Sequence, residues 1–135
     1  MKLALYKGKG TVGNAIIRWW TKSAYSHCEL VIGDVSYSSS LRDGGVRAKR
    51  IEFDPAHWDF VAIPWATEHE VKMLYAQTDG EPYGWLDLLW RQVFNRPGNS
   101  IGWFCSEWCA AALGLPAPQS FSPATLGDYC RMRLK

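Results

Sequence analysis

The chain has 135 residues, a length that is typical of one domain with its own hydrophobic core. Hydrophobic residues make up 47% of the sequence and eight residues are tryptophan, which excludes a globally disordered chain. The net charge of +2 is too small to indicate nucleic-acid binding by itself. We therefore expect a single domain that spans residues 1–135.

The N-terminal residues contain no long apolar core and no small-residue cleavage site, so they predict no secretory signal. No stretch approaches the ~18 apolar residues of a membrane-spanning helix. We therefore expect synthesis in the cytoplasm, no integral membrane segment, and action outside the cell only after lysis, by a non-classical export route, or by carriage in a larger, virion-like particle. The four cysteines are expected to be free thiols, because so apolar a chain does not need disulfide bonds to fold.

Apolar and polar residues alternate in the first half of the chain with the two-residue period of β-strands. Gly33 and Asp34 form a turn between two such segments, which predicts a β-hairpin. A helix that is capped by Asn14 and runs through Trp20 interrupts the strands. The predicted strands cover residues 3–6, 25–32, 35–39, 46–53 and 58–63.

From residue 67 onward the apolar residues recur with the period of helices. Thr67 and Glu70 have the spacing of a capping box, and Gly114 ends a later helix. Ser122, which a proline follows, predicts the start of the last helix. The predicted helices cover residues 67–78, 84–94, 105–113 and 122–129. Together these elements indicate an α+β fold in which helices pack against a small antiparallel sheet.

Cys105 begins one of these apolar helices, directly after a glycine-containing loop. A thiol at a helix N-terminus is biased toward the thiolate by the helix dipole and by free backbone N–H groups. His27 lies on an early strand, and Glu29 follows on the same face, where its carboxylate can orient the imidazole. A thiol and an imidazole that share a proton make a cysteine nucleophile. The candidate catalytic residues are therefore Cys105, His27 and Glu29.

The remaining cysteines and histidines are expected to have no direct role. They are Cys28, Cys109, Cys130, His57 and His69. Cys28 faces away from His27 on its strand, and Cys109 lies one helical turn deeper in the core than Cys105. The basic residues at positions 47–50 and 131–135 are expected to be solvated surface.

The chain carries four longer motifs, in the order YSHCELVIGD, SSSLRDGGVR, YGWLDLLW and FCSEWCAAALGL. This order resembles the circularly permuted branch of the NlpC-type papain-like hydrolases, which includes lecithin:retinol acyltransferase-like proteins and small bacterial and phage proteins. In that branch the histidine strand precedes the cysteine helix, the reverse of the order in papain. The resemblance covers residues 3–126.

The resemblance implies a permuted papain-like fold with Cys105 as nucleophile and His27 as general base. The residue that orients the imidazole varies in this superfamily, and a polar residue on the following strand often supplies it. That strand offers only serines and a tyrosine over residues 36–40, so Glu29 is the candidate for the third role.

The implied reaction is acyl transfer to the thiol, followed by hydrolysis of the thioester, with backbone N–H groups at the helix start holding the oxyanion. Tyr25 or Ser26 could help to shape that oxyanion site. Substrates in the superfamily include peptidoglycan peptides, lipid esters and amides, and isopeptides. We expect a peptidoglycan peptide substrate, a phage- or prophage-type component, and no cofactor or metal.

Other functions stay open. A catalytically inactive binding or structural module of the same fold, such as a component of a phage particle, would use its tryptophans to line a groove. A lipid acyl hydrolase or acyltransferase would share the nucleophile. A zinc site could form from His27, Cys28, Cys105 and Cys109, although His27 and Cys28 point to opposite faces of their strand. Single-stranded nucleic-acid binding would use aromatic residues with the basic residues 47–50, but no recognised motif supports it.

Overall fold

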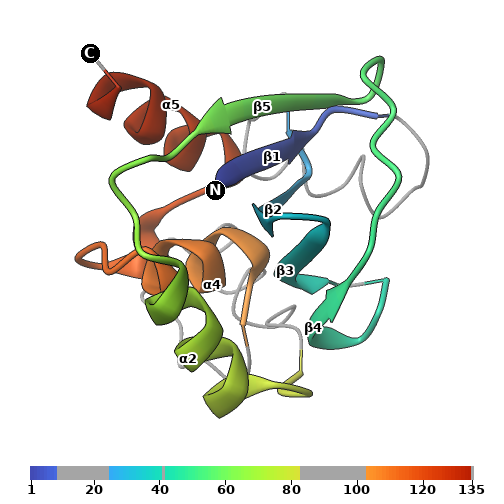
Figure 1. Cartoon of the computed structure of the whole chain (residues 1–135), viewed down its shortest axis with the longest axis vertical. Coiled ribbons are helices and arrows are strands. Elements are labelled where there is room, and N and C mark those ends of the chain that lie inside the picture. Colours follow the sequence, from blue (N-terminus) through green and yellow to red (C-terminus); the bar gives the residue numbers. More distant parts are fainter. Residues whose placement is uncertain (9–24, 41, 83–102, 135) are drawn as a thin grey trace, which may run out of the picture.

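The computed structural model describes residues 1–8, 25–40, 42–82 and 103–134, which Figure 1 draws as a coloured ribbon. These residues form an α+β fold in which a five-stranded antiparallel sheet packs against three helices. The expected α+β class is therefore confirmed. The predicted helices over residues 14–20 and 84–94 lie outside the described residues.

The described strands, in chain order, are β1 (Lys2–Tyr6), β2 (His27–Ile32), β3 (Val35–Ser40), β4 (Gly45–Lys49) and β5 (Trp58–Ala62). The helices are α2 (Glu68–Thr78), α4 (Cys105–Ala112), the short 3-10 helix η1 (Pro118–Ser120) and α5 (Pro123–Arg133). The strands lie in the order β4-β3-β2-β1-β5, and each neighbouring pair is antiparallel. Strand β2 therefore lies at the centre of the sheet.

The prediction of a strand over residues 46–53 is wrong in its second half, because β4 ends at Lys49. Strand β4 is an edge strand of the described sheet and pairs with β3. Lys49 faces Ser36, one residue after β3 begins at Val35. Val35 is the one β3 residue left beyond Ser36, so residues 51–53 have no β3 partner, and the ladder stops at Lys49.

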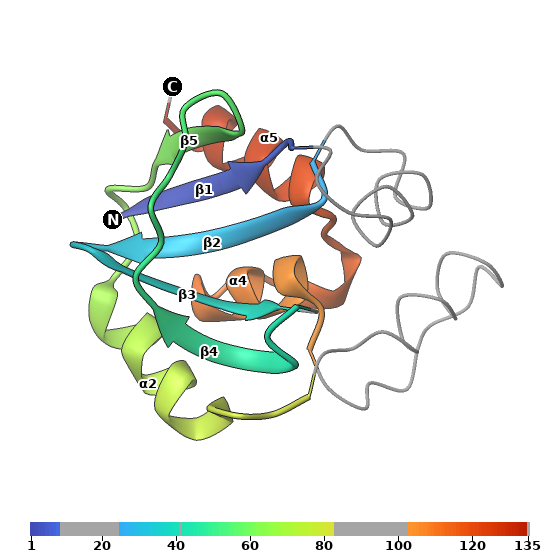
Figure 2. The ribbon, with the colours of Figure 1, turned by 90° about the vertical axis from the view of Figure 1, so that its right-hand side faces the viewer.

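The sheet face that meets the helices is apolar. Leu3 and Leu5 of β1 and Leu30 of β2 have no exposed area, and they share one core with Trp108 of α4 and Leu126 of α5. Burial of a leucine side chain contributes about 1.5–3 kcal/mol relative to leaving it exposed. Figure 2 shows α4 alongside β2 and β3, and α5 behind β1 and β5, in agreement with the contacts between these elements. The core therefore fixes α4 against the central strand.

Strands β2 and β3 are joined by a side chain near the beginning of β2. Their paired residues lie close to the Gly33 turn and extend to the pair Leu30–Tyr37. Beyond that pair, the Ser38 hydroxyl donates a hydrogen bond to the Cys28 carbonyl at 2.7 Å. The sulfur of Cys109 on α4 lies 3.9 Å from this same carbonyl oxygen. Helix α4 therefore reaches the backbone of β2 one residue away from His27.

Helices α2 and α5 begin differently. In α5, the Ser122 hydroxyl accepts from the Thr125 N–H at 3.2 Å, and the Thr125 hydroxyl accepts from the Ser122 N–H at 2.8 Å. In α2, the Thr67 side chain makes no capping hydrogen bond, so the predicted capping box with Glu70 is wrong. The acidic first turn, Glu68 and Glu70, still places negative charge at the positive end of the α2 dipole.

We expect Ser122→Ala to lower the free energy of unfolding by ~1 kcal/mol, because it removes the acceptor for a first-turn N–H group of α5. Thr67→Ala is the matched control at a helix start without a side-chain cap, and it should change stability by less than ~0.5 kcal/mol. Urea denaturation followed by circular dichroism measures both values. Equal losses at the two positions would contradict this difference between the caps.

Candidate active site

The beginning of β2 and the beginning of α4 lie side by side at one end of the sheet (Figure 2). Strand β2 begins at His27 and helix α4 begins at Cys105. The residue before the α4 cap is anchored, because the Ser39 hydroxyl donates to the Trp103 carbonyl at 2.6 Å and the Trp103 N–H donates to Pro82 at 2.9 Å. Cys105 is thereby held in the first turn of a helix, where backbone N–H groups lack partners within the helix.

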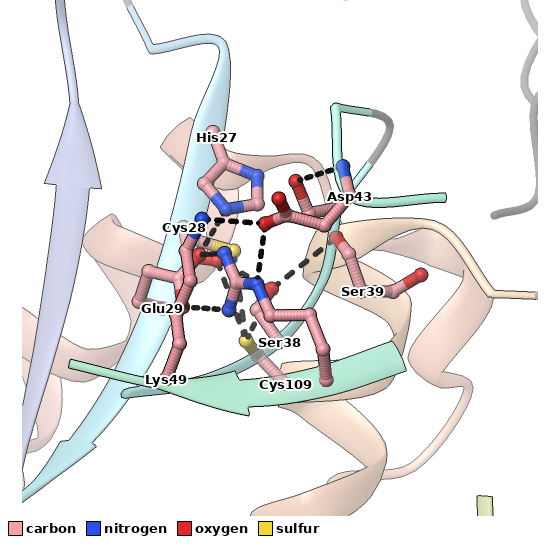
Figure 3. Close-up of polar contacts among 10 residues, drawn as sticks. His27, Cys28, Glu29, Ser38, Ser39, Asp43, Lys49 and Cys109 are labelled. Carbon is pink, nitrogen blue, oxygen red and sulfur yellow. Dashed lines mark hydrogen bonds and ion pairs between the residues drawn. The ribbon is translucent and has the colours of Figure 1, made fainter. Parts of the chain in front are cut away.

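Glu29 holds the His27 ring. It lies two residues further along β2, and its Oε2 atom bonds Nε2 of His27 (Figure 3). Because Nε2 is engaged, Nδ1 is the ring nitrogen that remains for Cys105. The two-residue spacing on which the sequence analysis depended therefore brings the carboxylate to the imidazole.

The surroundings of Cys105 lower its pKa to about 5. Burial by itself raises the pKa of a thiol, and Cys105 has no exposed area. Hydrogen bonds from the Cys28 thiol and the His27 ring, with the positive charge of that ring, favour the thiolate by more than burial disfavours it. These surroundings favour the thiolate form of Cys105 near neutral pH.

The pKa of His27 is raised to about 10. Burial lowers the pKa of an imidazole, but the charge of Glu29 and the hydrogen bonds with Cys105 and Glu29 raise it by more. These contacts favour the imidazolium form of His27 under the same conditions that favour the Cys105 thiolate. The opposite directions of the two pKa shifts favour a thiolate–imidazolium pair over a neutral thiol and imidazole.

Glu29 carries a negative charge with no exposed side-chain area, and Arg47 of β4 binds both of its oxygens. Nη1 of Arg47 lies 2.5 Å from Oε1, and Nη2 lies 2.6 Å from Oε2. Burial raises the pKa of a carboxyl group, but the charge of His27 and the Arg47 hydrogen bonds hold the pKa of Glu29 below its usual value. The expectation of a solvated surface at residues 47–50 is therefore wrong for Arg47, whose side chain is 15% exposed, and holds for Arg50 at 80%.

Arg47 is itself held by Asp43, which lies between β3 and β4. Its Nε atom donates to Asp43 Oδ2 at 2.7 Å, and the same oxygen accepts from Lys49 Nζ at 2.6 Å. Charges of alternating sign therefore run from the imidazole to the surface through His27, Glu29, Arg47, Asp43 and Lys49. Sequence reasoning missed this network. The sequence feature that could have indicated the network is the two-residue spacing of Arg47 and Lys49, on a strand that follows the acidic turn residue Asp43.

Three thiols meet where α4 packs on β2. Cys28 is buried as expected, and its sulfur lies 3.7 Å from that of Cys109. Burial and contact with Cys105 raise the pKa of Cys28, so this thiol stays protonated and donates a hydrogen bond to Cys105. The contact between Cys28 and Cys105 was not expected from the alternation of β2. All four cysteines are free thiols, as predicted.

Other polar residues near the beginning of β2 have separate surroundings. The Tyr25 hydroxyl donates to Asp59 at 2.5 Å and accepts from Arg131 at 3.1 Å, so this side chain belongs to another polar cluster. The Ser26 hydroxyl is buried and has no hydrogen-bond partner among the described residues. His57 is exposed, and its Nδ1 atom lies 3.4 Å from Oδ2 of Asp54.

Access differs between the two members of the ion pair. The Cys105 side chain has no exposed area, whereas 17% of the His27 side chain is exposed. A substrate carbonyl must come within ~3.5 Å of the sulfur to react. It must therefore displace the groups that cover Cys105, and the imidazole is the exposed edge of the pair.

In the part of the chain that the structure describes, no group of three or more histidine, cysteine, aspartate or glutamate side chains is arranged to hold a metal ion. The zinc site considered for His27, Cys28, Cys105 and Cys109 therefore has no geometric support.

No helix within the described ranges is long and apolar enough to cross a bilayer. Comparisons with protein-family models, curated proteins and solved structures found no match to this chain.

We expect the rate of Cys105 alkylation by iodoacetamide to rise with pH around a midpoint near 5, because the thiolate is the reactive form. His27→Ala removes a hydrogen bond and a positive charge from the thiolate, so its midpoint should move up toward the ordinary thiol value of 9.0. Peptide mapping by mass spectrometry identifies the labelled residue. Cys28 and Cys130, whose pKa values are raised, should stay unlabelled in the folded protein. Equal labelling of all four thiols would contradict selective activation of Cys105.

Proposed function

We propose that the protein is a cysteine hydrolase that cleaves an amide bond, with Cys105 as nucleophile, His27 as general acid–base and Glu29 as the residue that orients the imidazole. The observation that supports this proposal is the set of contacts at the start of α4. The surroundings of Cys105 and His27 favour a thiolate–imidazolium pair, and Glu29 bonds the ring at Nε2. Such a pair is the activated form of a cysteine nucleophile.

In the first half of the reaction, the Cys105 thiolate attacks the carbonyl carbon of the amide. The oxyanion that forms is stabilised by backbone N–H groups in the first turn of α4. His27 then gives its proton to the leaving amine nitrogen, and the C–N bond breaks. A thioester on Cys105 and a neutral imidazole remain.

In the second half, His27 takes a proton from a water molecule that attacks the thioester carbonyl. The C–S bond breaks, the carboxylic acid leaves, and the thiolate and imidazolium are restored. General acid–base catalysis contributes roughly 10²- to 10⁴-fold to such rates. One oxyanion donor contributes roughly 10²- to 10³-fold.

The permuted papain-like arrangement and the substrate belong to the same proposal. The chain order supports it, because the strand that carries His27 precedes the helix that carries Cys105. We propose peptide amides of peptidoglycan as the substrate and a phage- or prophage-type component as the setting. Lipid esters and amides, and isopeptides, are the other substrate classes that the resemblance implies.

A catalytically inactive binding or structural module of the same fold is the second candidate. One observation favours it, since Cys105 has no exposed area and reactive cysteines are usually partly exposed. In such a module, the buried charges of Cys105, His27 and Glu29 would only satisfy one another inside the fold.

We expect the protein to release new amino groups from peptidoglycan fragments that carry peptide stems. Cys105→Ser should lower the rate by about a thousandfold or more, because a serine hydroxyl is not ionised by this imidazole. Cys109→Ser is the matched control, since it removes a buried thiol one turn along the same helix and should keep the activity. An amine-reactive dye gives the rate, and mass spectrometry of the fragments identifies the cleaved bond.

Acid quenching during turnover should trap a thioester, and peptide mapping should place it on Cys105. Turnover that persists in Cys105→Ser would refute the nucleophile. Binding of the fragments without turnover, equal in the wild type and Cys105→Ser, would favour the binding module. Cleavage of a lipid ester or an isopeptide in parallel reactions, with intact peptidoglycan, would keep the hydrolase and change its substrate class.

A further inference from the structure

We propose that Arg47 is a positioning residue for the Cys105–His27 pair, which keeps the Glu29 carboxylate charged and fixed against the imidazole without touching the reacting atoms. This inference rests on the proposed function and adds a residue that neither the motifs nor the expected triad includes. In Figure 3 the Glu29 side chain lies between the imidazole of His27 and strand β4.

The two ends of the Arg47 guanidinium grip the two oxygens of Glu29. Nη1 bonds Oε1 at 2.5 Å and Nη2 bonds Oε2 at 2.6 Å, and Oε2 also bonds the His27 ring. A planar fork of this kind fixes both the position and the plane of a carboxylate. A lysine ammonium is a single point of charge and cannot fix that plane. The orientation that Glu29 gives to His27 therefore depends on the guanidinium.

Arg47 reaches Glu29 across strand β3. In the register of the sheet Arg47 faces Ser38, and β2 lies on the far side of β3. Two strand spacings amount to ~10 Å, a distance that requires a long side chain. Ser38 is small, and its hydroxyl bonds the Cys28 carbonyl instead of Glu29. The register thus explains why Arg47, of all the basic residues at 47–50, meets the site.

The Nε atom, which is the third donor of the guanidinium, binds a second carboxylate. Nε of Arg47 donates to Asp43 Oδ2, which also accepts from Lys49. Burial raises the pKa of Asp43, but hydrogen bonds from Lys49 and Arg47 outweigh it and lower that pKa to about 2. Asp43 therefore stays charged over the whole pH range in which the Cys105–His27 pair is charged. Arg47 is thus held between two carboxylates.

The charged groups that face His27 and Glu29 are the Cys105 thiolate of α4 and Arg47, with Asp43 and Lys49 behind it. Without Arg47, the Glu29 carboxylate and the Cys105 thiolate would share one cation. Either Glu29 would then take up a proton and leave the imidazolium without support, or the thiolate would become less stable. The first outcome lowers the upper pH limit of the charged pair, and the second raises its lower limit. Both narrow the pH window of the pair.

The experiment measures this window in the full chain. The lower limit is the midpoint of Cys105 alkylation by iodoacetamide, and the upper limit is the titration of the His27 ring by NMR. Arg47→Met should narrow the window by about one pH unit or more, equivalent to about tenfold in an ionisation equilibrium. Arg47→Lys should recover only part of the loss, because it restores the charge and not the fork. Arg50→Met, in the same basic cluster but 80% exposed, should leave the window unchanged.

A double variant tests whether Arg47 acts through Glu29. If it does, Glu29→Gln with Arg47→Met should have the same window as Glu29→Gln alone, because no carboxylate remains to be held. Additive narrowing in the double variant would overturn the proposal. Arg47→Met leaves a buried charge unpaired and can fail to fold. In that case Arg47→Lys decides, and a window equal to that of the wild type would overturn the proposal.

The outcomes for the inference and for the proposed function are distinct. A wild-type Cys105 with the midpoint of an ordinary thiol would refute the hydrolase, and the inference with it. A wild-type protein with a low midpoint and an Arg47→Met variant with the same window would overturn the role of Arg47 alone.

Discussion

The buried carboxylate of Glu29 is the constraint on which the arrangement at the end of the sheet depends. Moving an ion out of water costs several kcal/mol even after relaxation, so a carboxylate with no exposed side-chain area must be paired and hydrogen-bonded. Glu29 meets this requirement with the His27 ring on its own strand and with Arg47 on β4, across β3. One side chain thus ties the start of the central strand to the edge of the sheet. The same ties fix the ring plane of His27, since Nε2 cannot rotate away from Glu29 without leaving that charge underpaired.

The electrostatics of Cys105 follow from this constraint. A thiol without exposed area would ordinarily stay protonated, because burial disfavours the thiolate. Glu29 keeps His27 in its charged form, and the charged ring in turn favours the thiolate of Cys105. The Cys28 thiol adds a hydrogen bond and stays protonated itself. The pKa values of these two cysteines shift in opposite directions, because the His27 ring acts on Cys105, whereas burial and the other thiols raise the pKa of Cys28. The first-turn position of Cys105 in α4 acts in the same direction, through the helix dipole.

The sequence contains the local half of this site. The two-residue period places His27 and Glu29 on one face of a strand, and the start of an apolar helix marks Cys105, so these three residues follow from short-range patterns. Arg47 does not, because its role depends on which strands are neighbours and on the register that sets it opposite Ser38. In that register the Arg47 side chain reaches Glu29, whereas Arg50, three residues later, lies beyond the end of the ladder and is exposed. The early end of β4 and the missing cap at Thr67 have a similar cause, since pairing partners and side-chain rotamers are decided by tertiary packing rather than by local propensity.

The ionisation of Cys105 and its accessibility to a substrate are separate properties of this site. The sulfur is buried, whereas part of the imidazole that activates it is exposed. The ion pair determines how much thiolate exists at a given pH, whereas the cover over the sulfur determines how often a carbonyl can reach it. Exclusion of water strengthens the attraction between Cys105 and His27, because charges interact more strongly in a low dielectric. Opening the site to a substrate admits water and weakens that attraction, unless the substrate itself takes the place of the displaced groups. A hydrolase built on this pair must therefore close around its substrate, whereas a binding module would keep the sulfur covered throughout. The exposed part of the pair is the imidazole, with 17% of the His27 side chain accessible. At this point a hydrolase would open the site to its substrate, and a binding module would not.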